Sequence, residues 1–288
     1  MMPWWAKRAL LALASVGGAA YLYARAVEPN RLVVREHTLG MPSLDPAFDG
    51  YRIAHLSDLH VSGRAALERF DRAIALVNEA AVDLIVITGD FVTASVGFDG
   101  AVLSERLRSL CARDGIVAVM GNHDHRAHAA AVRRVIAESG VVHLPNAVHT
   151  LRRGSAALHI AGLDSVYFQQ GRFDHLLAAL PADGAAILLA HEPDIADLAA
   201  ALGRFDLQLS GHAHGGQVRI PVLYRMALPF QGSRYVTGLY YVKTMIVYVS
   251  AGLGMTSHPV RFNCPPEVAM FTLLAGRRLA GTQPNITG

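Results

Sequence analysis

The sequence is poor in thiols, in charged residues and in clustered basic residues, and each shortage excludes a class of protein. Its two cysteines, Cys111 and Cys264, have no second cysteine at metal-ligand spacing, which excludes a zinc ribbon and argues against a disulfide framework. Charged residues make up 17% of the chain and hydrophobic residues 52%, a balance typical of a large buried core. Lysine and arginine are scattered and the formal net charge is only +3, so we expect no nucleic-acid partner. Nothing in the sequence predicts a protein partner.

The N-terminal segment, residues 1–26, contains an uncharged and mostly apolar stretch over residues 9–24, preceded by Lys7 and Arg8. As a helix, these residues would reach about 24 Å, somewhat less than the roughly 30 Å hydrocarbon core of a bilayer. Aromatic residues of the kind found at membrane interfaces bracket the stretch: Trp4, Trp5, Tyr21 and Tyr23. We therefore predict a helix that spans a membrane, or nearly so.

A cleaved signal peptide is the main alternative for this segment. Ala24, Arg25 and Ala26 form an A-x-A-like cleavage site, and cleavage there would release a secreted protein. The bulky Tyr21 and Tyr23 lie awkwardly close to that site, so we favour a retained single anchor. A buried helix of a soluble protein is a third reading, disfavoured because the stretch has no polar face. Basic residues flank the stretch on both sides, so the side of the membrane stays open.

The rest of the chain predicts an α/β domain over residues 51–275. Residues 27–50 contain a predicted strand at 31–39 and a connecting loop at 41–50, and residues 276–288 form a predicted loose tail. Continuous apolar runs at 51–57, 82–89, 115–121, 185–190 and 205–211 indicate strands buried on both faces. Helical periodicity occurs at 65–80 and 127–139. After Gly216 the segments are rich in β-formers, which predicts a second sheet packed on the first.

Each of the five apolar runs ends in residues that can bind a metal. The candidate ligands are Asp58, His60, Asp90, Asn122, His191, His212 and His214. Strand ends converge at one crevice in open α/β sheets, and the 32-residue spacing from Asp58 to Asp90, repeated from Asp90 to Asn122, fits neighbouring βαβ units. In the D-x-H and H-x-H motifs, we expect both ligands on the same side of an extended backbone. The glycines before Asp90, Asn122 and His212 would let the backbone approach a crowded site.

The chemistry of this set points to two divalent ions. All donors are oxygen or nitrogen, which suits Mn²⁺, Fe or Zn²⁺, and the order of affinities alone does not choose among them. We expect Mn²⁺, with Fe or Zn²⁺ as alternatives. Two ions bring +4 and the two aspartates return −2, and the surplus positive charge favours an anionic phosphoester and the ionisation of a bridging water. We therefore predict hydrolysis of a phosphodiester or pyrophosphate by attack of that hydroxide on phosphorus. A single Asp or His at a strand end is usually a helix cap or loop residue, so the prediction depends on the set as a whole.

These blocks together, D-x-H, G-D, G-N-H-D, H and G-H-x-H in that order over residues 58–214, resemble the calcineurin-like metallophosphoesterase superfamily. The resemblance implies a four-layer α/β/β/α sandwich with the apolar N-terminal helix added. It assigns Asp58, His60 and His214 to one ion, Asn122, His191 and His212 to the other, and Asp90 to a bridge between them. It also implies that His123 is the general acid at the leaving group. The residue that orients His123 stays open, with Asp124 as one candidate.

The apolar segment, the block GHAHGGQVRIP and the ending SAGLG…RFNCPPEV resemble a bacterial membrane-associated branch of that superfamily. The branch implies location at the inner membrane and hydrolysis of a nucleotide-linked lipid, UDP-2,3-diacylglucosamine, in lipid A synthesis. Residues that follow Asp90 lack the G-D-x-x-D-R-G pattern of Ser/Thr protein phosphatases, which disfavours that activity. A nuclease or nucleotide phosphodiesterase on the same site, and a non-catalytic metal-bound scaffold, stay open as alternatives. Candidate substrate contacts are Arg64, Gln217, Arg219 and Arg261.

Overall fold

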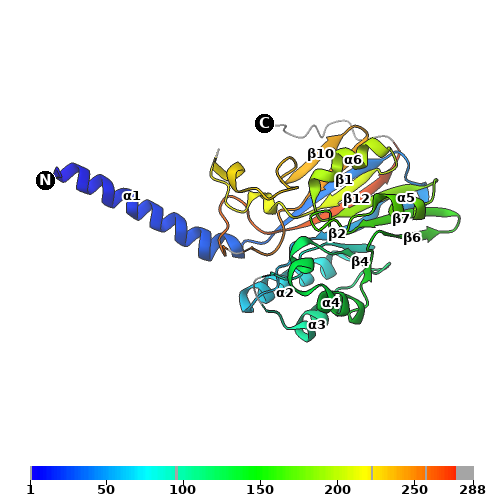
Figure 1. Ribbon diagram of the computed structural model, residues 1–288, viewed down its shortest axis with the longest axis horizontal. Coiled ribbons are helices and arrows are strands. Elements are labelled where there is room, and N and C mark those ends of the chain that lie inside the picture. The colour runs from blue at the N-terminus through cyan, green and yellow to red at the C-terminus, as the bar shows by residue number, and fades with distance from the viewer. Residues whose placement is uncertain (1, 95–96, 222, 257, 277–288) are drawn as a thin grey trace.

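Two six-stranded sheets form the centre of the computed structural model, which describes residues 2–94, 97–221, 223–256 and 258–276 (Figure 1). The first sheet contains, in spatial order, β1 (Val33–Met41), β12 (Glu267–Ala275), β2 (Tyr51–Leu56), β3 (Leu84–Thr88), β4 (Ile116–Val119) and β5 (Val142–His143). The second contains β10 (Gly238–Val242), β11 (Met245–Val249), β9 (Leu207–Ser210), β8 (Ala185–Ala190), β7 (Ala156–Leu163) and β6 (Ala147–Arg153). Most neighbouring strands are parallel; the antiparallel pairs are β12–β2, β10–β11 and β6–β7.

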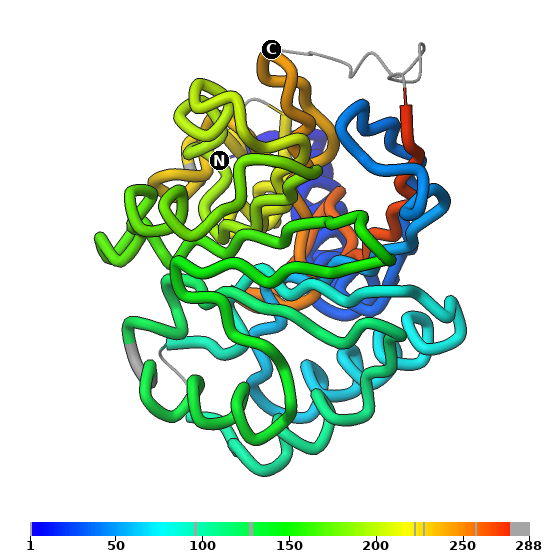
Figure 2. The backbone as a smooth tube through the Cα atoms, turned by 90° about the vertical axis from the view of Figure 1, so that its right-hand side faces the viewer, coloured from blue at the N-terminus to red at the C-terminus, as the bar shows by residue number. Residues whose placement is uncertain are grey.

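The sheets are stacked face to face, and helices cover both outer faces. The helices on the first sheet are α2 (Arg64–Ala80), α3 (Gly100–Arg108) and α4 (Asn122–Glu138), and those on the second are α5 (Phe173–Ala179) and α6 (Ala196–Leu202). Figure 2 shows the first group below the sheets, in cyan and green. Three apolar cores separate the four layers, one between the sheets and one beneath each group of helices. The predicted α/β/β/α sandwich is therefore confirmed.

Side-chain alternation explains how one strand serves two of these cores. In β2, Ile53 packs between the sheets whereas Ala54 faces the helices; in β3, Leu84 and Ile85 divide in the same way. Because both faces are buried, each strand is a continuous apolar run, as the sequence predicted. Strands β2, β3 and β4 are adjacent and parallel, in the order that the 32-residue spacing predicted.

The predicted composition of the second sheet was wrong in two respects. Residues 218–221 and 223–225, which belong to the β-rich segments after Gly216, form no strand. The short helix η6 (Leu223–Ala227) begins there, and Pro221 cannot donate to a β-ladder. The last strand, β12, joins the first sheet between β1 and β2, and four strands of the second sheet, β6 to β9, precede Gly216. The strand predicted at 31–39 is β1, displaced by two residues.

An apolar helix precedes the sandwich and projects from it (Figure 1). Helix α1 (Trp4–Leu22) has no buried residue and continues through η1 (Tyr23–Val27) and η2 (Glu28–Asn30). The 27-residue segment Trp4–Asn30 is long and apolar enough, by length and composition, to cross a membrane. An anchor and a signal sequence fit this finding equally well. The segment boundaries at 26, 50 and 275 stay predictions, and residues 277–288 of the predicted tail lie outside the described residues.

Candidate metal centre

The predicted ligands come from strand ends that meet across the sandwich. Asp58 and His60 follow β2, Asp90 follows β3 and Asn122 begins α4 after β4, all in the first sheet. The other three follow strands of the second sheet: His191 after β8, and His212 and His214 after β9. Convergence of the five strand ends was predicted for one open sheet, but two sheets contribute. All seven side chains are buried.

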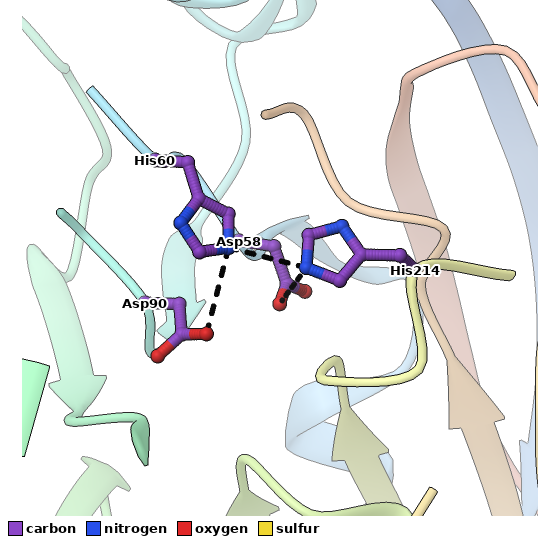
Figure 3. A group of neighbouring side chains, drawn as sticks. All are labelled: Asp58, His60, Asp90 and His214. Atoms are coloured by element: carbon purple, nitrogen blue, oxygen red, sulfur yellow. Dashed lines mark hydrogen bonds and ion pairs between the residues drawn. The ribbon is translucent and has the colours of Figure 1, made fainter. Parts of the chain in front are cut away.

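Four of these side chains form one compact group, in which Asp58, His60, Asp90 and His214 point toward one another (Figure 3). One donor atom from each lies within 4.8 Å of the others. Nε2 of His60 lies 3.1 Å from Nε2 of His214, and the latter lies 3.3 Å from Oδ1 of Asp58. This buried group of two carboxylates and two imidazoles can hold a divalent metal ion.

The other three side chains form a second group beside the first. Oδ1 of Asn122 lies 3.1 Å from Nε2 of His191 and 2.9 Å from Nδ1 of His212. The two ring nitrogens are 3.3 Å apart. Atoms bound at about 2.1 Å to one ion and separated by about 90–110° lie about 3.0–3.4 Å from each other. The three distances of the second group lie close to this range, as do the contacts of His214 with His60 and Asp58 in the first group.

The carboxylate of Asp90 lies between the two groups. Its Oδ2 is 3.5 Å from Nε2 of His60 and 3.2 Å from Nε2 of His191. Its Oδ1 accepts a hydrogen bond from the backbone N–H of His123 at 2.8 Å, which fixes the plane of the carboxylate. One side chain therefore contacts both groups, which is the arrangement that a bridging ligand needs.

Left-handed backbone, rather than extended backbone, brings the paired ligands together. Asp58 and His60 have φ of 50° and 43°, and His212 and His214 have φ of 66° and 50°. Asp90 has φ of 54°. The reason given from the sequence for the D-x-H and H-x-H spacing was therefore wrong, although the ligands do converge. Non-glycine residues with positive φ are uncommon and cluster where the surrounding structure enforces them at functional sites.

Glycines beside the ligands allow close approach of the backbone, as predicted. An ideal Cβ on Gly121 would lie 2.7 Å from the backbone nitrogen and 2.8 Å from Cγ of Asp90. On Gly211 it would collide with the side chains of Ser57 and Asp58. Neither neighbour can move without displacing a candidate ligand.

Replacing Gly121 with alanine should therefore displace Asp90 and lower the metal content of the purified protein. We expect at least about a tenfold loss of hydrolytic rate, because small misplacement of catalytic groups is costly. The measurement is metal analysis together with rate at saturating Mn²⁺. Gly97→Ala is the matched control, since a Cβ there meets nothing within 4 Å. Equal metal content and rate in the two variants would show that the close approach at Gly121 is unimportant.

Hydrogen bonds to the outer ring nitrogens orient three of the histidines. Nδ1 of His191 contacts the carbonyl of Thr88 at 2.7 Å, and Nδ1 of His60 contacts Oγ1 of Thr93 at 3.1 Å. His212 is turned the other way, with its Nε2 at 2.8 Å from the carbonyl of Phe230. Because a backbone carbonyl only accepts, His191 and His212 donate to it and present the opposite nitrogen's lone pair to the site.

Burial and neighbouring charges shift the pKa values of the candidate ligands in both directions. Although burial opposes it, the carboxylate of Asp90 raises the pKa of His191 well above its usual range. Burial lowers the pKa of His60 to about 3 and holds that of His214 well below its usual range, so both rings are neutral. Although burial opposes it, contact with His191 holds the pKa of Asp90 well below its usual range. Burial raises the pKa of Asp58 to about 6, with Asp90 adding to the shift. At neutral pH the group therefore offers two carboxylates and two neutral imidazoles, the forms that bind metal.

His123 lies at the rim of the two groups, with its ring centroid 4.9 Å from that of His60. Its Nδ1 accepts a hydrogen bond from the backbone N–H of Ala94 at 3.1 Å, so the proton of the neutral ring is on Nε2. Asp124 does not orient it, contrary to the candidate role given from the sequence. That carboxylate accepts from the N–H groups of Gly121 and Val92 and so fixes the start of α4. A backbone amide was not recognisable from the sequence as a partner of His123.

A pocket of about 630 Å³ opens over the site. The candidate ligands that line it are Asp90, Asn122, His212 and His214, together with His123. Sequence analysis missed Arg126 and Tyr167, which also line it and contact each other at 5.9 Å from guanidinium to ring centroid. Neither residue belongs to a motif. The buried carboxylate of Glu192, the residue after His191, accepts hydrogen bonds from residues 165–167 and thereby positions Tyr167.

Of the four candidate substrate contacts, one lines the pocket. Gln217 lines the pocket. Arg261 is wholly buried and its guanidinium donates to the carbonyls of Ala251, Gly252, Gly254 and Cys264, so it is not free to bind substrate. Arg64 is exposed, pairs with Glu68 and does not line the pocket. Arg219 stacks on Tyr224 and is also absent from the pocket lining.

Known proteins share this sequence pattern over most of the chain. The model of the calcineurin-like phosphoesterase family matches residues 51–216. Metallophosphoesterase YkuE of Bacillus subtilis is 36% identical over 92% of this chain and 93% of its own length. Phosphodiesterase YaeI of Escherichia coli is 28% identical over 91% of this chain and 95% of its own. A transmembrane protein with a metallophosphoesterase domain from Danio rerio is 28% identical over 88% of this chain and 60% of its own.

The family match covers the strands and the strand ends that carry the buried group of Asp58, His60, Asp90 and His214. The observed sandwich and the residues of the motifs agree with it. The chain therefore belongs to the calcineurin-like phosphoesterase family and is a metal-dependent phosphoester hydrolase.

Proposed function

We propose that the protein is a two-metal hydrolase of a phosphodiester or pyrophosphate bond. Asp58, His60 and His214 hold one ion in this proposal, and the second group holds the other: Asn122, His191 and His212. Asp90 bridges the two ions. The observation that carries the proposal is the position of the Asp90 carboxylate, 3.5 Å and 3.2 Å from a ring nitrogen of each group. Two divalent ions in these positions, Mn²⁺ ahead of Fe or Zn²⁺, would supply the nucleophile by ionising water and would neutralise the phosphoryl oxygens.

His123 is the catalytic residue of the protein itself in this proposal. An imidazolium would place an N–H at Nδ1 against the N–H of Ala94, and burial also lowers the pKa of His123, so the neutral ring is favoured. We therefore assign it a hydrogen bond from Nε2 to the departing oxygen, in place of the full proton transfer expected from the resemblance. A donor of this kind stabilises the charge that develops on the leaving group.

The proposed substrate is a nucleotide-linked lipid, UDP-2,3-diacylglucosamine, at the inner membrane. The apolar helix α1 supports a membrane location, as does the name of the transmembrane relative from Danio rerio. A single retained anchor is proposed because Tyr21 and Tyr23 lie close to the A-x-A-like site. The phosphodiesterase name of the relative from E. coli supports phosphodiester or pyrophosphate chemistry. We expect UMP as the released product, since attack at one phosphorus of the pyrophosphate separates it from the lipid phosphate.

A nuclease or nucleotide phosphodiesterase would use the same site, but the scattered basic residues give no track for a nucleic-acid backbone. A non-catalytic scaffold would keep the metals and lack turnover. Metal content cannot separate a scaffold from an enzyme, whereas turnover does.

The experiment is hydrolysis of UDP-2,3-diacylglucosamine by the detergent-solubilised protein, stripped of metal and then given Mn²⁺. Bis(p-nitrophenyl) phosphate serves as a generic phosphodiester in parallel, and Asp90→Ala is the inactive control. Release of UMP that requires both metal and Asp90 supports the whole proposal. Turnover of the generic ester alone would exclude the lipid as substrate and support the two-metal chemistry. If neither compound is hydrolysed, the non-catalytic scaffold is favoured.

A further inference from the structure

The outer rim of the active-site pocket is an exposed apolar loop. This rim loop comprises residues 218–221 and 223–230 and contains η6. Its two ends line the pocket through Val218, Pro229 and Phe230. Between them, large apolar side chains project into solvent, with Leu223 58% and Met226 85% exposed. Soluble surfaces seldom gather large apolar side chains in this way unless the patch binds something.

The rim loop adjoins the base of the apolar helix. Val218 pairs with Phe262 in a β-bridge, and the N–H of Arg219 donates to the carbonyl of Phe262 at 2.8 Å. The ring of Phe262 meets that of Tyr23, near the end of α1, with centroids 6.4 Å apart. In Figure 1 the yellow rim loop accordingly lies beside the point where α1 leaves the sandwich. Residues far apart in sequence therefore form one end of the molecule.

This connection is fixed by buried polar contacts. The N–H of Arg261 donates to the carbonyl of Ala24 at 2.8 Å, and the buried carboxylate of Glu28 accepts hydrogen bonds from the N–H groups of Asn263 and Cys264. Arg69 of α2 donates to the carbonyl of Pro29 at 2.8 Å. The end of the apolar helix is thus fastened to the domain, and the rim loop keeps a defined position relative to it.

The charges around the rim loop suit an acidic surface. Residues 207–266 contain no aspartate or glutamate. Two of the basic residues in this stretch belong to the rim loop: Arg219, whose guanidinium covers the ring of Tyr224, and the exposed Arg225. Arg25 and Arg31 lie at the base of the apolar helix, and Arg31 donates to the hydroxyl of Tyr23. Exposed apolar side chains interspersed with arginine are characteristic of segments that lie in the interface of a bilayer containing anionic lipids.

We propose that the rim loop inserts its apolar side chains into the surface of the bilayer that α1 spans, so that the active-site pocket opens at the lipid headgroups. The inference rests on the retained anchor and deepens the proposed function, because it explains how a phosphoester with acyl chains reaches the site. The head of such a substrate would enter beneath Phe230 while its chains stay in the membrane.

The test places an environment-sensitive fluorophore at single cysteines of the full chain. The parent is Cys111→Ser, since Cys111 is exposed and Cys264 is buried. Labels go at Met226→Cys in the rim loop, at Val16→Cys in α1 and at Leu198→Cys on α6. Leu198 is the matched control because its exposed fraction, 53%, is similar to the 58% of Leu223 in the rim loop. It lies on α6, which covers the outer face of the second sheet. The protein is reconstituted in vesicles of phosphatidylethanolamine and phosphatidylglycerol, with and without lipids spin-labelled near the headgroup.

The proposal predicts a blue shift and at least about a twofold quenching at Met226, and no quenching at Leu198. A second substitution, Leu223→Glu, should reduce both effects because a carboxylate is repelled by the interface. If the label at Met226 is unquenched while the label at Val16 is protected by the membrane, the proposal is overturned and the anchor is retained. If neither label is protected, both the inserted rim loop and the membrane anchor are overturned. A blue shift that persists in detergent and grows with protein concentration assigns the loop to a second copy of the chain. None of these readings requires turnover, so failure of the proposed chemistry is detected separately.

Discussion

Replacing Asp90 with asparagine is expected to lower kcat/KM for a phosphodiester by at least about a thousandfold, with loss of bound metal. Asparagine keeps the shape and the acceptor for the N–H of His123, so the fold should persist. It removes the charge that faces both His60 and His191, and a neutral amide cannot bridge two divalent ions well. Kinetics at saturating Mn²⁺ and metal analysis of the same sample measure the effect.

Asp99→Asn is the control for this variant. Asp99 caps the start of α3 by accepting from the N–H groups of Ala101 and Val102, and asparagine caps helices equally well. We expect Asp99→Asn to have the same hydrolytic rate and the same metal content as the parent protein. Full activity of Asp90→Asn with two ions bound would exclude a bridging role for Asp90.

Replacing His123 with glutamine is expected to lower kcat by about 10²–10³-fold on an alkyl phosphodiester, while both metal ions stay bound. The loss should be smaller on a p-nitrophenyl ester, because p-nitrophenolate needs little stabilisation as it departs. This dependence on the leaving group separates a role in catalysis from a role in holding the metal. The measurement compares kcat for the two esters in the variant and the parent.

His125→Gln, on the same helix, is the matched control. His125 pairs with Asp164 at 2.7 Å and is not among the residues that line the pocket. For His125→Gln we expect the ratio of kcat on the alkyl ester to kcat on the p-nitrophenyl ester to be nearly the same as in the parent protein. An equal loss on both esters in His123→Gln would contradict the assignment to the departing oxygen.

The sequence predicted the parts of the fold that depend on burial and spacing. Strands β2, β3 and β4 are continuous apolar runs because both of their faces are covered, and their 32-residue spacing sets their order. Strand pairing across long distances was not predictable in this way. Nothing in the segment 267–275 says that it inserts between β1 and β2, since its apolar pattern suits either sheet.

The candidate site shows the same division. The ligand types and their order could be read from the motifs, because metal chemistry restricts which side chains occur. The backbone that presents them could not: the positive φ values at Asp58 and His212 are enforced by tertiary contacts and not by local preference. The partners of the ligands were also hidden, since the carbonyls of Thr88 and Phe230 and the amide of Ala94 carry no side-chain signature.

Metal stoichiometry combined with electron paramagnetic resonance of the Mn²⁺-loaded protein tests the central claim most directly. The seven proposed ligands predict two ions per chain and a spectrum of two exchange-coupled Mn²⁺ ions bridged by Asp90. Asp90→Asn should lose the coupling. One ion per chain, or two ions with the spectrum of isolated Mn²⁺, would contradict a bridged two-metal centre.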